Sequence, residues 1–98
     1  MTRNRIKRRD DNHAPVVQAM ERVGATVKDT SQVAGFCDVV VGFRGETRLV
    51  EIKDGSKPPS ARKLTPDESA FHEKWRGSPV DIVNSEDEAI ALVRGMGV

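Results

Sequence analysis

The sequence predicts a small α/β fold in which helices flank a mixed β-sheet, in the order α-β-β-β-α-β-α. A run rich in β-branched residues, 38–43, is followed after a turn over residues 44–47 by an alternating run over residues 47–53. This pair is typical of a β-hairpin. Helix-start signals precede two later segments, at residues 65–68 and 85–88.

The first helix is expected over residues 12–22. Apolar residues recur there at helical spacing, and Pro15 falls in the first turn, where its missing N–H is harmless. Gly24 favours termination of the helix. A short strand is expected over residues 26–29, before the hairpin.

The second half of the chain begins with a loop over residues 54–64, which contains two prolines and no periodicity. The capped helix after it carries Phe71 and Trp75 on one face and ends at a Gly-Ser-Pro segment. A short strand over residues 80–83 and a last helix that closes before Gly95 complete the predicted fold.

The length of 98 residues suits one domain with a marginal core, so a homodimer is expected. Residues 1–11 are interpreted as a flexible basic tail and residues 12–98 as the domain. The single cysteine, Cys37, excludes an internal disulfide and fits a reducing cytosol. No apolar run reaches the roughly 20 residues that cross a bilayer, which predicts a cytoplasmic protein without a membrane partner.

Although the net charge is only +1, the basic residues are concentrated in two clusters. The first nine residues contain no acid and five bases, namely Arg3, Arg5, Lys7, Arg8 and Arg9. The second cluster lies around the proline-containing loop and consists of Lys53, Lys57, Arg62 and Lys63. Basic segments of this kind suit a protein that handles phosphodiesters, and Lys57, Arg62 and Lys63 are the predicted phosphate contacts. A solubilising tail and a solvated loop are the alternative.

The candidate active site lies on the hairpin. Asp38 opens its first strand, and Glu51 and Lys53 point to the same face of its second strand, roughly 7 Å apart. If the hairpin brings Asp38 beside Glu51, the two carboxylates repel and favour a cation between them. Hard oxygen ligands favour Mg²⁺ or Mn²⁺ over zinc.

With such a cation, Lys53 would orient a water molecule or stabilise charge on phosphoryl oxygens, which predicts phosphodiester hydrolysis. The alternative interpretation of Glu51 and Lys53 is a solvent-facing charge pair. An aspartate such as Asp38 at the start of a strand is also common as a turn residue.

The segment GFCDVVVGFRGETRLVEIKDG resembles the PD-(D/E)XK nucleases, in which an acid follows a turn and (D/E)-X-K ends the next hairpin strand. Residues 9–89 further resemble the small stand-alone virus-type replication-repair nucleases (VRR-NUC), and EIKDGSKPPSARKLTPDESAFHEKW is especially similar. The resemblance implies a restriction-endonuclease-like core. It also implies a metal held by Asp38, Glu51 and the backbone carbonyl of Ile52, with Lys53 as the catalytic lysine.

The same resemblance implies a homodimer that cuts branched DNA, such as a four-way junction, in a bacterial or phage-infected cell. The sequence departs from the family at two places. Cys37 replaces a frequent proline, and the first-helix glutamate of many members is missing near Pro15. Asp11, Asn12 and Glu21 are the alternatives for that acid, whose absence concerns a second metal more than the first.

Several other residues have structural explanations that compete with functional ones. His13 and His72 are expected on the surface or in hydrogen bonds rather than in catalysis. Glu68 is explained by the capping box, with a site role as the alternative. Asp54 is expected to cap the loop after Lys53.

Two further pairs are weighed in the same way. Asp29 and Ser31 could line the rim of the site. Phe71 and Trp75 are expected in the core or in a dimer contact, with stacking on a base as the alternative.

Three functional hypotheses follow from the sequence. The first is a Mg²⁺- or Mn²⁺-dependent, structure-selective DNA endonuclease. The second is a nucleic-acid-binding module that has kept the nuclease fold but has little or no turnover. The third is a partner subunit whose basic tail docks it to a larger machine.

Overall fold

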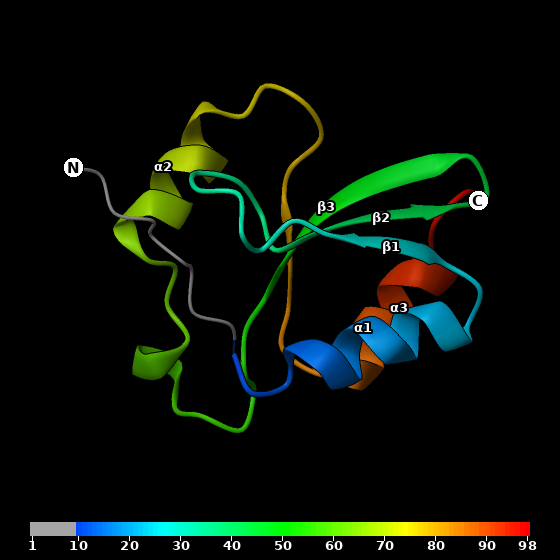
Figure 1. Ribbon diagram of the computed structural model, residues 1–98, viewed down its shortest axis with the longest axis horizontal. Helices are drawn as coiled ribbons and strands as arrows, with labels where there is room; N and C mark the ends of the chain where they lie inside the picture. Colours follow the sequence, from blue (N-terminus) through cyan, green and yellow to red (C-terminus); the bar gives the residue numbers. More distant parts are fainter. Residues whose placement is uncertain (1–9) are drawn as a thin grey trace.

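The computed structural model describes residues 10–98 and has the predicted α/β order of elements (Figure 1). The helices are α1 (His13–Arg22), α2 (Pro66–Lys74) and α3 (Glu86–Arg94), and a short 3₁₀ helix spans Pro59–Ala61. The strands are β1 (Thr26–Asp29), β2 (Val39–Phe43), β3 (Glu46–Ile52) and β4 (Asp81–Val83). The predicted tail, residues 1–11, lies outside the described residues except for Asp10 and Asp11. Within residues 10–98, no helix is both long and apolar enough to cross a membrane.

The sheet is mixed, with strand order β1-β2-β3-β4. The first three strands are antiparallel neighbours, and β4 pairs with β3 in parallel after the chain has crossed over through α2. The β2–β3 turn is shorter than the predicted residues 44–47, because Phe43 already pairs with Glu46. Arg44 and Gly45 alone form it, at φ values of 51° and 79°, and two positive φ values are typical of a tight hairpin turn.

The hydrophobic core lies between the sheet and the helices α1 and α3, which run side by side along one face of the sheet (Figure 1). Val50 and Ile52 of β3 point into this core. Because side chains alternate along a strand, Glu51 points to the opposite face. There the loop after β1 and the helix α2 cover one end of the sheet, with the Phe36 and Phe71 rings 5.3 Å apart. Strand β3 therefore contributes to the core with one face and to an acidic cluster with the other.

The helix starts follow the predicted capping signals at two places. The Thr65 hydroxyl accepts from the Glu68 N–H, and the Glu68 carboxylate accepts from the Thr65 N–H, which completes a capping box at α2. The Ser85 hydroxyl accepts from the Glu88 N–H at α3. Asn12 occupies the N-cap position of α1 but makes no capping bond. Its amide donates instead to the carbonyls of Lys53, at 2.8 Å, and Asn84, at 3.3 Å, and so ties α1 to the ends of β3 and β4.

The loop after β1 is anchored by Asp29. One oxygen of this carboxylate accepts from the Ser31 N–H at 2.9 Å and from the Ser31 hydroxyl at 2.6 Å, and the other lies 3.1 Å from His13 Nε2. Burial raises the pKa of Asp29, but the hydrogen bonds from Ser31 and His13 outweigh it and bring the pKa to about 2. Asp29 and Ser31 therefore fix the loop to α1, which gives these predicted rim residues a structural role.

We predict that Asp29→Asn lowers the free energy of unfolding by about 1 kcal/mol at pH 7, because it removes the charge that accepts from Ser31 and faces His13. The effect is small because solvent screens this side chain, which is 38% exposed. The folded-state pKa of about 2 lies below the ordinary value of 3.8, so this stabilisation is present above pH 3.8 and is lost as the pH falls through 2. Urea denaturation followed by circular dichroism from pH 7 to pH 2 measures it. A difference between the two proteins that stays constant over this range would contradict the assignment.

Candidate metal centre

Asp38 is held in place by the hairpin that follows it. Its N–H donates to the Val50 carbonyl at 3.1 Å, and its Oδ2 accepts from the Ile52 N–H at 2.8 Å. The carboxylate thus extends the β2–β3 ladder by one step, which is why β2 begins at Val39 and not at the predicted Asp38. This arrangement brings Asp38 beside Glu51, as the hairpin prediction required.

Lys53 follows β3 and is held by α2. Its Nζ donates to Glu68 Oε1 at 2.6 Å, and both side chains are more than nine-tenths buried. The same Glu68 oxygen accepts from the Thr65 N–H at 2.9 Å, so the capping box fixes the carboxylate that positions the ammonium. From the sequence, capping and a site role of Glu68 were alternatives. In the structure the Glu68 carboxylate contacts both the Thr65 N–H of the capping box and the Lys53 ammonium.

Three carboxylates converge at this point. Asp38, Glu51 and Glu68 each offer an oxygen, and these atoms lie within 4.8 Å of one another. The three residues are 5%, 0% and 7% exposed. Buried carboxylates at such distances repel strongly, and a divalent cation among them would relieve that repulsion. A set of hard oxygen donors fits Mg²⁺ or Mn²⁺ better than zinc, so the residues present fit the expected metal.

His72 of α2 contacts the same cluster. Its Nε2 lies 3.3 Å from Glu51 Oε2, and its side chain is 16% exposed. The expectation of a hydrogen-bonded histidine is met, but sequence reasoning did not connect it with Glu51. The available signal was the spacing, because His72 is four residues after Glu68 and shares its helix face.

Asp10, three residues before the start of α1, was not among the substitutes considered for the missing first-helix acid. Burial raises the pKa of Asp10, nearby Lys53 and Lys57 oppose this shift, and Asp38 adds to it. Asp10 therefore lies within electrostatic reach of the cluster. Of the candidates from the sequence, Asn12 contacts the Lys53 carbonyl, whereas Glu21 is exposed nine residues further along α1, about 13 Å away along the axis.

The predicted phosphate-contacting residues lie in the loop between β3 and α2. Arg62 Nε donates to the Lys57 carbonyl at 2.7 Å, which closes the loop on itself, and Lys63 is exposed beside it. Asp54 Oδ1 accepts from the N–H and the hydroxyl of Ser56, at 2.9 and 2.6 Å, so its predicted loop-capping role is confirmed.

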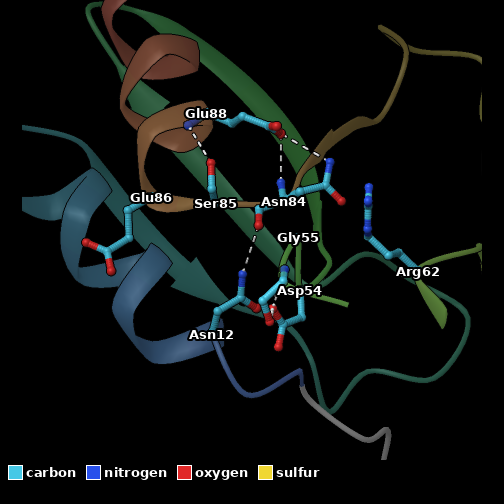
Figure 2. Close-up of a pocket in the computed structure, with 9 residues that line it drawn as sticks. Asn12, Asp54, Gly55, Arg62, Asn84, Ser85, Glu86 and Glu88 are labelled. Carbon is cyan, nitrogen blue, oxygen red and sulfur yellow. Dashed lines mark hydrogen bonds between the residues drawn. The ribbon is translucent and has the colours of Figure 1, made fainter. Parts of the chain in front are cut away.

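An open cavity of about 460 Å³ lies between this loop and the start of α3, and Figure 2 shows the residues that line it. Arg62 lines it together with Asn12, Asp54 and Asn84. Gly55 brings the two segments together, since its N–H donates to the Asn84 carbonyl at 2.8 Å and a Cβ there would lie 2.6 Å from that oxygen. The basic loop is therefore attached to the segment between β4 and α3.

The chain matches no protein-family model, no curated protein and no solved structure.

We predict that Mn²⁺ raises the Tm of the protein and that Glu51→Gln weakens this effect. A 100-fold excess of metal over its Kd stabilises a protein by about 2.7 kcal/mol. Loss of a ligand should weaken binding at least about tenfold. Differential scanning fluorimetry with a Mn²⁺ titration measures both. Asp87→Asn removes an exposed acid from α3 and is the matched control; equal metal responses of the two variants would exclude the cluster as the binding site.

Proposed function

We propose that this protein is a Mg²⁺- or Mn²⁺-dependent nuclease that hydrolyses DNA phosphodiester bonds, of the PD-(D/E)XK kind and the VRR-NUC group. The observation that supports the proposal best is the convergence of Asp38, Glu51 and Glu68 within 4.8 Å, with the Lys53 ammonium 2.6 Å from Glu68. A purely structural ion pair has no need of three buried carboxylates and one lysine, because the desolvation of each charge is costly.

In this proposal Asp38 and Glu51 hold the metal, with the Ile52 carbonyl as the further ligand that the family resemblance implies. The bound cation supplies Lewis-acid polarisation of the phosphodiester and makes water more acidic. The Lys53 ammonium stabilises negative charge that builds on the phosphoryl oxygens. Glu68 is the positioning residue for Lys53, because its carboxylate is fixed by the capping box and binds Nζ at 2.6 Å.

The substrate proposal rests on charge and on the resemblance. Lys57, Arg62 and Lys63 lie on the loop that leaves the active-site strand, where they would contact phosphates on either side of the scissile bond. Selectivity for branched DNA and action as a homodimer come from the resemblance to VRR-NUC proteins. Two sites related by a two-fold axis would suit a four-way junction.

We predict that Lys53→Met and Asp38→Asn each lower the rate of DNA cleavage at least about 100-fold, because the first removes the charge that stabilises the phosphoryl oxygens and the second removes a metal ligand. A gel assay with labelled four-way junction, single strand and linear duplex in Mn²⁺ measures the rate, and EDTA should stop the reaction. Circular dichroism establishes that each variant is folded.

Lys28→Ala is the matched control, since it removes an exposed lysine from β1 and should retain full activity. Undiminished cleavage by Asp38→Asn or in EDTA would contradict the nuclease proposal. Tight junction binding by the wild-type protein without any product would favour the alternative of a binding module with the nuclease fold.

We also predict that Lys63→Ala weakens DNA binding about equally for all sequences and reduces the slope of log Kd against log salt by about 1, as loss of one phosphate contact should. Lys63 is a cleaner test than Arg62, whose side chain also closes the loop through the Lys57 carbonyl. Fluorescence anisotropy of labelled DNA in EDTA at several salt concentrations measures the slope. An unchanged slope would remove Lys63 from the interface.

A further inference from the structure

An aromatic side chain lies between two cations where α2 ends. Lys74, Trp75 and Arg76 are consecutive and all exposed, and Trp75 is 39% accessible. Tryptophan is usually highly buried, so an exposed indole in a small fold needs an explanation. Surfaces that bind single-stranded nucleic acid combine cations for the phosphates with aromatic rings on which bases stack.

The Trp75 ring is part of a row of rings that leads to the acidic cluster. It lies 5.4 Å from the Phe71 ring, measured between centroids, and Phe71 lies 6.2 Å from the ring of His72. His72 Nε2 in turn lies 3.3 Å from Glu51 Oε2. The exposed indole is therefore joined to the proposed metal site by direct contacts.

Two further residues, Gly77 and Phe36, lie around this row of rings. Gly77 lies so close that a Cβ at this position would be 2.7 Å from Trp75 Nε1, so only glycine leaves room for the ring here. Phe36 packs edge-on against Phe71 at 5.3 Å and braces the row from the loop after β1. Because the Trp75 ring packs against Phe71, it loses less conformational entropy on binding than a free side chain would, which favours stacking.

We propose that Lys74, Trp75 and Arg76 bind the DNA strand next to the metal site, with the Trp75 indole stacked on an unpaired base. This inference rests on the proposed nuclease function and deepens it. Trp75 follows Glu68 by seven residues, about 10 Å along the helix axis, so one strand could reach both the metal site and the indole. The substrate class it selects is DNA with an unpaired base near the scissile bond.

A base inside an intact duplex is covered on both faces and cannot stack on a protein side chain without being extruded. The proposed segment thus gives a physical reason for preference of branched or single-stranded DNA over linear duplex. A second copy of this chain is the competing occupant, but lysine is depleted from the centres of protein interfaces. The flanking cations favour a polyanion.

The test uses intrinsic fluorescence, because Trp75 is the single tryptophan of the chain. The full-length protein in EDTA is titrated with an oligo-dT single strand and with a blunt duplex of the same length. We expect the single strand to quench the indole emission strongly and the duplex to do so weakly. Equal quenching by both, or none by the single strand, would overturn the proposal whether or not any variant folds.

Variants extend the test through anisotropy of labelled DNA. Trp75→Ala should weaken single-strand binding about 5- to 150-fold, as loss of one stacked base does, with little effect on the duplex. Trp75→Phe should retain most of the affinity, and Val98→Ala, at a fully exposed apolar residue away from α2, should change nothing. Unchanged DNA binding by Trp75→Ala would overturn the proposal. A shift of this variant from dimer to monomer in sedimentation, without a change in DNA affinity, would assign the surface to a second copy.

Because these measurements are made in EDTA, their outcome does not depend on cleavage. Stacking without any nuclease activity would leave this inference standing as strand binding and contradict only the proposed reaction. Cleavage that persists without stacking would contradict this inference and leave the proposed nuclease reaction standing.

Discussion

The hydrogen bond from the Ile52 N–H to the Asp38 carboxylate is the contact on which the rest of the site depends. It lies beyond Val39 and Val50, the last residue pair of β2 and β3. There the Ile52 N–H donates to a side-chain carboxylate and not to a backbone carbonyl. Because Ile52 itself points into the core, this bond fixes the carboxylate relative to the hydrophobic layer under α1 and α3. Glu51, on the opposite face of the same strand, is then brought beside Asp38 by pleat geometry alone.

The charge of this cluster explains why α2 is needed. Buried carboxylates so close together require compensation, and the Lys53 ammonium supplies a positive charge through its 2.6 Å contact with Glu68 of α2. The capping box holds Glu68 through the Thr65 N–H, so helix initiation and site assembly use the same carboxylate oxygen. Phe71 and His72 continue the helix along the site, which connects the acidic cluster with the exposed ring of Trp75. Strand β3 and helix α2 thus carry most of the proposed chemistry.

The parts of this arrangement that depend on local periodicity were predictable. The positions of Glu51 and Lys53 on one face follow from strand alternation, and the capping box was visible in the sequence. The convergence of Glu68 and His72 on the cluster was not, because a loop without periodicity places α2 against the sheet. The hairpin turn was predicted too long, since nothing marks Arg44 as a residue that adopts a positive φ of 51°. The nuclease activity and the homodimer stay predictions.

The most direct test of the central claim is anomalous diffraction from a crystal of the protein soaked in Mn²⁺. The account predicts a single strong peak within coordination distance of the Asp38 and Glu51 carboxylates, with Lys53 adjacent to it. Peaks confined to exposed acids such as those at the start of α3, with Asp38 and Glu51 in contact with protein groups only, would contradict the assignment of this cluster as a metal centre.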